Sequence, residues 1–482
     1  MSSFRFLAVY KVEAFIIFLL SVVSFLPPLF YSLFVEDGEI LSFLVPFSIS
    51  LLLFSLSVPI KTYQLTEKEA LFVSVSIWFL FPLFAALCYL ISEYITDPID
   101  AYFEAVSGFT TTGASILTDI EKLPPSVLMF RNLTNWVGGL GFVVFAVSFL
   151  STKLPIGRAI VKFESSKVIE EKIEPRVKEV AKIIIAVYIS LTVLEILILK
   201  ILGVSWYNSI TYTFATVATG GFAPKNASAG IFNSPAIETV IGIFMILGAI
   251  NLQLYYISFK KKSIKRFFVD EEVRVFLGII AFSSLFSAFI LYENGYYNNF
   301  LESLRYAFFQ ISSAATTTGF SSTDYSNWHS AVLSLMLIVA LIGAVGGSTG
   351  GGIKIYRLIF IYQTVKGEIK KLAHSNIVYR LSVKGKPVDI NKTNMFWAFL
   401  SVYLFSTVFF GFILTVGGHD LITSFSASIA CITSLGPGLG DVGPASNFSS
   451  LSDFEKLSLS FEMIFGRLEI IPVISLLFLK NL

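Results

Sequence analysis

The chain has 482 residues, of which 55% are hydrophobic and only 14% are charged, and its formal net charge is +2. Soluble domains carry about a quarter charged residues, so this composition excludes an ordinary soluble protein and predicts a membrane protein. With about 20 apolar residues per span, the length allows on the order of ten spanning helices and no large soluble domain. The two cysteines, Cys88 and Cys431, lie in apolar sequence and offer neither a disulfide framework nor a zinc site.

The apolar runs predict the spanning segments in chain order. The first run follows a short, weakly basic N-terminus without a small-residue cleavage site, so we expect a spanning helix rather than a removed signal. Ten spans are expected, near residues 12–34, 40–60, 70–93, 126–150, 179–202, 235–259, 273–292, 329–363, 394–416 and 455–479.

Four shorter, half-apolar stretches separate the third span from the fourth, the fifth from the sixth, the seventh from the eighth and the ninth from the tenth. Their starts carry residues typical of helix N-termini, at Asp97-Pro98, Asn208-Ser209, Asn299 and Asp420. These stretches are too short to cross a bilayer, so each predicts a re-entrant half-helix followed by non-helical backbone that faces protein or water.

The expected fold is therefore an all-α integral membrane protein. It has about ten transmembrane helices plus four re-entrant pore half-helices, arranged as four tandem helix–pore loop–helix repeats around one pore. The expected units are an N-terminal two-helix extension at 1–66 and pore repeats at 67–152, 153–262, 263–390 and 391–482. The third repeat has a broken second helix.

Each half-helix ends in a short polar tripeptide with a final glycine. The glycines are separated by 107 (220 minus 113), 99 (319 minus 220) and 117 (436 minus 319) residues, which indicates one repeated unit. A single Thr-Gly pair would be an ordinary helix C-cap. Four matched copies instead predict a central axis where backbone carbonyls replace the hydration shell of a cation, with glycine allowing positive φ. The expected filter residues are Thr110, Thr111, Thr112 and Gly113; Val217, Ala218, Thr219 and Gly220; Thr316, Thr317, Thr318 and Gly319; and Thr433, Ser434, Leu435 and Gly436.

Basic residues set the expected orientation. They concentrate in the segments 153–182, 260–274 and 366–392, whereas the opposite loops are mainly acidic. The positive-inside rule therefore predicts a cytoplasmic location for the basic segments and both termini, with the four pore loops entering from outside. The half-helices then point their negative C-terminal dipole ends inward, which suits cations.

The eighth span contains six glycines within ten residues, from Gly343 to Gly352. Each costs a helix about 1 kcal/mol relative to alanine, so we expect a non-helical loop at membrane depth. A packing patch of small residues is the alternative. Arg467, in the middle of the last span, is expected in the cavity beneath the filter, held by Glu462, Glu469 or loop carbonyls, because a lone guanidinium in lipid is costly. A structural salt bridge with Glu469 is the other interpretation.

Several motifs carry a family resemblance. The sequences Phe109-Thr110-Thr111-Thr112-Gly113-Ala114, 214–222, 316–320, 346–354 and 466–470 resemble the Trk/Ktr/HKT superfamily of potassium transporters. The two additional N-terminal helices make the chain similar to the TrkH branch rather than to the shorter KtrB branch. The sequence departs from the family pattern at Leu435, where the other repeats carry threonine, and this favours a looser filter.

The resemblance implies a potassium pathway within one subunit, a homodimer and a cytosolic nucleotide-binding TrkA-type regulatory ring. It places an intramembrane gate below the filter, at Gly346, Gly347, Ser348, Thr349, Gly350, Gly351, Gly352 and Lys354 together with Arg467. We expect potassium as substrate and no cofactor in this chain, with nucleotides acting only through the partner. Membrane lipid is a further expected partner, and nucleic acid is not.

The favoured function is gated potassium uptake across a prokaryotic cytoplasmic (inner) membrane, driven by membrane potential. The alternative is a symporter that couples potassium to protons or sodium. The sequence favours the uncoupled pathway because it shows no chain of intramembrane carboxylates or histidines for a proton relay. An enzyme is not expected, since neither a His-Glu-x-x-His motif nor a nucleophile-elbow serine is present. Glu104, inside the first half-helix, is either a buried hydrogen-bond acceptor or a source of negative potential behind the filter.

Overall fold

The structure is a computed structural model that describes residues 5–61, 65–151, 177–263, 265–373, 382–383, 386–387 and 390–477. Most of the first basic segment and the expected boundary between the first two repeats, at residues 152 and 153, lie outside these residues. Within these residues the regular structure is helical, apart from a two-stranded antiparallel pair formed by β1 (Ser382–Val383) and β2 (Lys386–Pro387).

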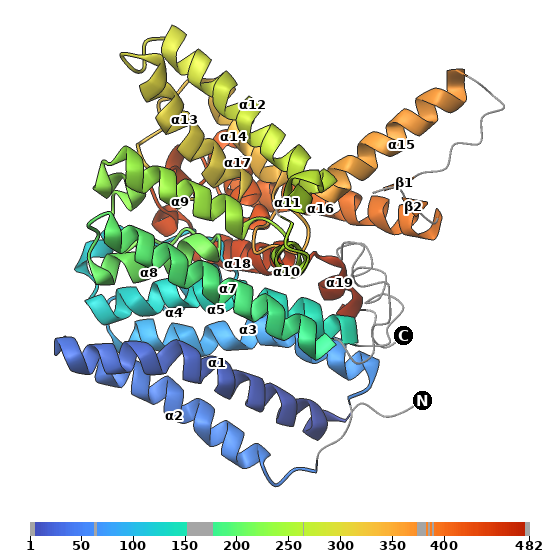
Figure 1. Cartoon of the computed structure of the whole chain (residues 1–482). Coiled ribbons are helices and arrows are strands. Elements are labelled where there is room, and N and C mark those ends of the chain that lie inside the picture. The colour runs from blue at the N-terminus through green and yellow to red at the C-terminus, as the bar shows by residue number, and fades with distance from the viewer. Residues whose placement is uncertain are drawn as a thin grey trace.

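The N-terminal extension consists of α1 (Phe6–Val35) and α2 (Ile40–Ser57), which pack against each other along the edge of the molecule (Figure 1). The rings of Phe18 and Phe54 stack with centroids 4.7 Å apart. The start of α1 and the end of the last helix lie on the same side of the molecule, from which the long helix α15 projects.

Four repeats follow the extension, each with a first helix, a half-helix and a second helix. The first helices are α3 (Glu67–Ile91), α7 (Val177–Ile201), α12 (Glu271–Glu293) and α16 (Ile390–Val416). The half-helices are α4 (Pro98–Phe109), α8 (Trp206–Val217), α13 (Phe300–Ala315) and α17 (Leu421–Thr433). The second helices begin with α5 (Pro125–Ser151), α9 (Pro235–Gly248), α14 (Ser330–Ile342) and α18 (Asp453–Arg467).

The half-helix starts agree with the sequence in three repeats. The side chains of Asp97, Asn299 and Asp420 accept hydrogen bonds from the first-turn amides, which is the role of an N-cap. The prediction at Asn208-Ser209 was wrong, because the N-cap there is Ser205, whose hydroxyl accepts from the amide of Asn208 at 3.2 Å.

Three of the four second helices are broken within the described residues. The break expected in the eighth span is confirmed: α14 ends at Ile342 and α15 (Ile355–Ala373) begins 13 residues later. The sixth span was expected to be continuous, but α9 and α10 (Leu252–Lys260) meet at 88° because the Asn251 side chain caps a new helix. The last span also breaks, between α18 and α19 (Ile471–Leu477), where Glu469 and Ile470 both have φ of 58°. A short helix, α11 (Lys265–Val269), precedes α12.

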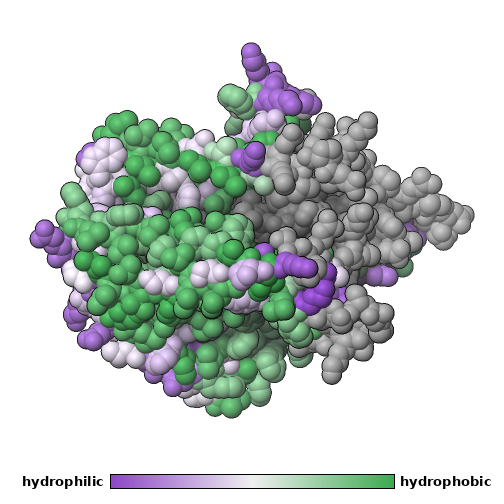
Figure 2. Space-filling model, turned by 90° about the horizontal axis from the view of Figure 1, so that it is seen from below, coloured by the Kyte–Doolittle hydropathy of each residue, from purple (hydrophilic) through white to green (hydrophobic). Residues whose placement is uncertain are grey.

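The outside of the molecule is suited to lipid. Among the described residues, six helices are long and apolar enough to cross a membrane, or seven if α9 and α10 form one bent span. Figure 2 shows a broad hydrophobic face with hydrophilic residues at its margins, and exposed apolar side chains of α1 and α2 include Phe30, Leu41 and Leu52. The chain is therefore an integral membrane protein.

Candidate functional site

A residue with left-handed backbone lies one or two positions after the end of each half-helix. The φ angles of 57°, 53°, 55° and 60° belong to Thr111, Thr219, Thr317 and Ser434. The amide that follows each of them bonds to the carbonyl five residues earlier, at 2.8 to 2.9 Å. This geometry is a helix C-cap, so each tripeptide does cap its half-helix, as the alternative interpretation held. What distinguishes these four caps is where they meet.

The backbone corrects the register of the second repeat. A glycine with positive φ lies two positions after each left-handed residue, and these glycines are Gly113 (82°), Gly221 (75°), Gly319 (83°) and Gly436 (94°). The sequence spacing matched Gly220 to Gly113, but Gly220 instead occupies the position of Thr112. The intervals are therefore 108 (221 minus 113), 98 (319 minus 221) and 117 (436 minus 319) residues.

The four glycines close a ring. A Cβ atom on Gly113 would lie 2.6 Å from the carbonyl oxygen of Gly220, and one on Gly221 would lie 2.0 Å from that of Thr318. The same relation continues around the ring: Gly319 faces the Leu435 carbonyl oxygen (2.0 Å), and Gly436 faces that of Thr112 (2.6 Å). Each repeat therefore touches the next, and the fourth touches the first. Only glycine permits both this close approach and the positive φ.

Side chains support the ring unequally. The hydroxyls of Thr110 and Thr112 lie 2.7 Å apart in the first repeat, and those of Thr316 and Thr318 lie 2.7 Å apart in the third. The matching positions are Ala218 and Gly220 in the second repeat and Thr433 and Leu435 in the fourth, where no such pair can form. The two repeats with hydroxyl pairs are opposite each other in the ring.

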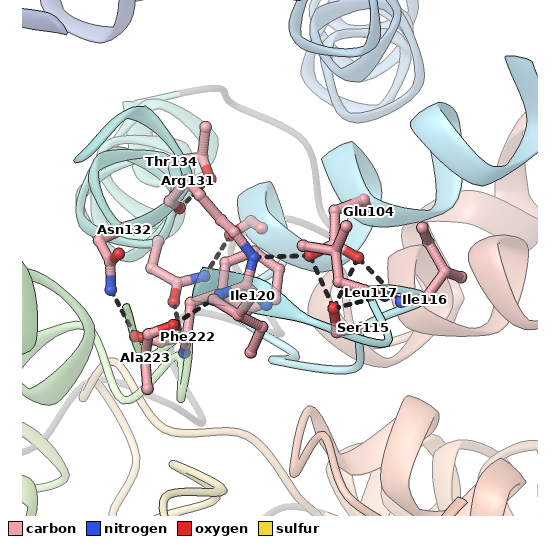
Figure 3. Close-up of polar contacts among 12 residues, drawn as sticks. Glu104, Ser115, Ile116, Leu117, Ile120, Arg131, Asn132, Thr134, Phe222 and Ala223 are labelled. Atoms are coloured by element: carbon pink, nitrogen blue, oxygen red, sulfur yellow. Dashed lines mark hydrogen bonds and ion pairs between the residues drawn. The ribbon is translucent and has the colours of Figure 1, made fainter. Parts of the chain in front are cut away.

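A buried ion pair, which the sequence did not reveal, braces the first repeat (Figure 3). The carboxylate of Glu104 accepts hydrogen bonds from the Arg131 Nε at 2.7 Å, from the Ser115 hydroxyl at 3.0 Å and from the Ile116 amide at 3.0 Å. Both charged side chains are at most 2% exposed. Because Arg131 neutralises the carboxylate, this geometry supports the interpretation of Glu104 as a buried hydrogen-bond acceptor.

The same face of α5 holds the backbone just beyond the ring in the second repeat. Arg131 donates to the carbonyl of Ala223 at 3.0 Å, and its guanidinium carbon lies 3.5 Å from the Phe222 ring centroid. Asn132 donates to the Phe222 carbonyl, and Asn135 accepts from the Phe222 amide at 3.1 Å. The signal available in the sequence was three polar residues, at 131, 132 and 135, inside an apolar span.

On one side, the ring opens into a cavity of about 170 Å³. Its lining includes Gly113, Gly221 and Gly319 of the ring, together with Pro437 after the fourth glycine. Lys225 also lines it and pairs with Glu121 at 2.8 Å, which links the loops of the first two repeats. This mouth lies on the side where the half-helices begin.

On the other side, the glycine-rich loop 343–354 lies against the half-helix ends. The Thr349 hydroxyl lies 3.1 Å from the Val217 carbonyl oxygen and 3.0 Å from that of Gly248. A Cβ on Gly350 would lie 2.8 Å from the Thr316 carbonyl oxygen, and one on Gly351 only 1.9 Å from that of Thr433. The loop therefore contacts the ends of three half-helices, and its small residues are required by that fit.

The loop is anchored by its own residues and by neighbouring helices. The Ser348 hydroxyl donates to the Val345 carbonyl at 2.6 Å, and the Lys354 ammonium donates to the carbonyl of Gly350. The Gly346 amide donates to the carboxylate of Glu272 in α12 at 3.2 Å. The Gly347 carbonyl accepts from the amide of Leu252 at 3.3 Å.

Arg467 reaches the loop from the end of α18. Its Nη1 donates to the carbonyl of Thr349 at 2.7 Å, and its Nη2 donates to that of Gly138 in α5 at 3.3 Å. The guanidinium, in a residue only 4% exposed, thus ties the loop to the first repeat. Of the expected holders, loop carbonyls are the ones observed, whereas Glu469 pairs with Arg357 of α15 and Glu462 accepts from the Ser428 hydroxyl at 2.6 Å.

Two buried carboxylates, one in the candidate span α7 and one in α18, bear on the argument that the sequence lacks acids for a proton relay. Glu195 of α7 and Glu462 of α18 are both 0% exposed, and each lies beside a half-helix. Fully buried acids are therefore present among the helices, although they belong to different repeats.

Comparison with known proteins gives a consistent answer. A sequence model of the TrkH family, described as "cation transport protein", matches residues 61–481. The chain is 34% identical over 461 residues to the Trk system potassium uptake protein TrkG of Escherichia coli K12, covering 94% of each chain. It is 33% identical over 415 residues to TrkH of Salmonella typhimurium, covering 86% of each. The fold is similar to the crystal structure of the potassium transporter TrkH from Vibrio parahaemolyticus, with a TM-score of 0.90, 30% identity and 98% of each chain covered.

Proposed function

The chain belongs to the TrkH family of cation transport proteins, a family of transporters rather than enzymes, and on that premise we propose that it carries potassium into the cell through a gated pore. The observation that supports this most directly is the closed ring of glycine and carbonyl contacts through all four repeats. Such a ring brings four short backbone segments to one axis, where their carbonyl oxygens replace the hydration shell of a cation.

The polarity of the half-helices supports a cation as the transported ion. All four end at the ring, so their C-terminal carbonyls place negative partial charge beside the pathway. Membrane potential then drives uptake without a second ion. The filter comprises residues 110–113, 217–221, 316–319 and 433–436, with Gly221 added to the expected set as the ring glycine of the second repeat.

The loop 343–354, here called the gate loop, and Arg467 form the proposed gate. The gate loop contacts the ends of three half-helices, and Arg467 connects it to the first repeat. A pathway leaving the ring on this side meets the gate loop and a buried positive charge together. Displacement of the gate loop is therefore the proposed opening step.

The proposal also includes the location of the protein in the membrane and its assembly with partners. The basic segments near α10, α11 and α15 support a cytoplasmic location for the gate side and for both termini, in a prokaryotic inner membrane. The family resemblance adds a homodimer and a cytosolic TrkA-type nucleotide-binding ring, with lipid around the spans. The mass of the purified protein and co-purification of a nucleotide-binding partner test these two assemblies.

A symporter is the second candidate, and Glu195 and Glu462 are the observation that favours it. Flux into liposomes containing only this protein separates the two. With an imposed inside-negative voltage and no pH or sodium gradient, the pore predicts potassium uptake that follows voltage. Uptake that requires a proton or sodium gradient would replace the pore with the symporter.

A further inference from the structure

The cavity at the mouth of the ring contains a charge of the wrong sign for a cation pathway. Of the described residues that line this cavity, Lys225 alone carries a charge. The rest of the lining consists of small, polar or apolar residues, such as Ser115, Asn447 and Phe448. A cation on its way to the ring therefore passes an ammonium group, which repels it.

The charge of Lys225 is balanced by a single carboxylate. The Lys225 Nζ lies 2.8 Å from an Oε of Glu121, which belongs to the short 3-10 helix Ile120–Lys122. The hydrogen bond from Lys225 holds the pKa of Glu121 below its usual range, so the pair stays charged in a mildly acidic medium. Glu121 is not among the described residues that line the cavity. The positive member of the pair thus stands closer to the entering cation than the negative member.

The loops that carry these two residues are joined without their charges. The side-chain amide of Asn226 donates to the carboxylate of Asp119 at 2.8 Å, and its oxygen accepts from the amide of Ile120 at 2.7 Å. The side chains of Lys225 and Glu121 are 35% and 40% exposed, and an ion pair this exposed adds little stability. Stability alone therefore does not explain a lysine at this position.

We propose that Lys225 and Glu121 form an electrostatic control of cation entry, in which Lys225 lowers the cation concentration in the cavity and Glu121 offsets most of that effect. This inference rests on the proposed pore function. Charges at the entrance of a cleft change the local concentration of an ion without touching it. The pair acts before the ring, so it should affect potassium and sodium equally and leave the potassium-to-sodium ratio unchanged.

The size of the cavity gives the expected magnitude. A sphere of 170 Å³ is about 7 Å across. Two unit charges about 7 Å apart in water change the local concentration of either one about threefold. Salt screens charges over about 30 Å at 0.01 M but over only about 3 Å at 1 M, so an effect acting over 7 Å is present in dilute salt and lost in concentrated salt.

Glutamine substitutions test the proposal, because glutamine removes either charge and keeps a polar side chain. Potassium uptake is measured at fixed voltage in liposomes with the cavity side outward, as a function of external potassium, at low ionic strength. Lys225→Gln should lower the apparent KM about threefold, since the carboxylate then acts alone. Glu121→Gln should raise the apparent KM, by at most the same factor. The maximal rate should be unchanged in both, and the double variant should lie between them.

Ionic strength separates electrostatics from a change of shape. In about 1 M choline chloride, with osmolarity balanced on both sides, both single variants should return to the parental KM. Lys225→Arg keeps the charge and should match the parent throughout. Lys122→Gln is the matched control, because it removes an equal charge from the same loop, at a side chain that is 77% exposed and is not among the described cavity lining. Its KM should stay close to the parental value.

Three results would overturn the proposal. One is an unchanged KM in both Lys225→Gln and Glu121→Gln at low ionic strength. Another is a shift in KM that persists in concentrated salt, which would mean that the pair only holds the loops in place. The third is an equal shift in Lys122→Gln, which would assign the effect to general surface charge. Failure of the proposed function would look different, since the unaltered protein would then show no voltage-driven potassium uptake.

Discussion

Removal of the Arg467 side chain should open the pathway. In the structure its guanidinium donates to the Thr349 carbonyl at 2.7 Å and to the Gly138 carbonyl at 3.3 Å, so Arg467→Ala frees the gate loop from the first repeat and removes a buried positive charge. A hydrogen bond from a charged donor contributes about 2 kcal/mol. If only the shorter bond holds the closed state, its loss shifts the closed-to-open ratio roughly thirtyfold.

The assay is potassium uptake into liposomes at fixed voltage, normalised to inserted protein. Arg467→Lys is the informative companion, because it keeps the charge but cannot donate to both carbonyls in the fixed geometry of a guanidinium. A charge barrier alone predicts that the lysine variant behaves like the parent, and a tether alone predicts that it behaves like the alanine variant. Unchanged or lower flux in well-folded Arg467→Ala would refute the reasoning.

Three further predictions follow from the ring, the buried ion pair and the intramembrane acids. Gly113→Ser should lower the preference for potassium over sodium, which reversal potentials measure. Gly221→Ser should reduce potassium uptake, measured as flux, more severely than Gly113→Ser does, because its Cβ would lie 2.0 Å rather than 2.6 Å from a carbonyl oxygen. Arg131→Ala should lower the thermal unfolding midpoint in detergent, since an unpaired buried charge costs about 3 to 5 kcal/mol. Glu195→Gln and Glu462→Gln should leave voltage-driven potassium uptake intact; its loss, or a new dependence on pH gradient, would favour symport.

The first two of these predictions have a further check. An unaltered ion ratio in Gly113→Ser would remove the first repeat from the selectivity argument. Adding Glu104→Gln to Arg131→Ala should recover part of the lost stability, because the remaining buried group is then neutral. No recovery would mean that Arg131 acts mainly through its contacts with Phe222 and Ala223.

The sequence predicted the architecture well because its strongest signals are local. Apolar runs predict spans. Asp97, Asn299 and Asp420 predict where half-helices begin, because their side chains are typical helix N-caps. The run of glycines located the broken eighth span for the same reason, since the cost of glycine in a helix is intrinsic to the residue.

What the sequence missed depends on long-range contacts. Two adjacent glycines, Gly220 and Gly221, fit the repeat spacing equally well, and only the left-handed backbone of Thr219 fixes which one enters the ring. The bend at Asn251 and the break at Glu469 also escaped prediction, because mainly apolar sequence resumes beyond each polar residue and makes the span look continuous. Partners such as Arg131 for Glu104 lie 27 positions apart, beyond the reach of periodicity.

The ring has four quadrants, one from each repeat, and all four belong to a single polypeptide. In a channel assembled from identical subunits, one substitution alters every quadrant at once. Here a substitution alters one quadrant and leaves three in place, and Leu435 together with the unpaired positions 218 and 220 shows that the quadrants already differ. The quadrants of the ring can therefore change in separate steps, and the three whose half-helix ends contact the gate loop can change independently of the first.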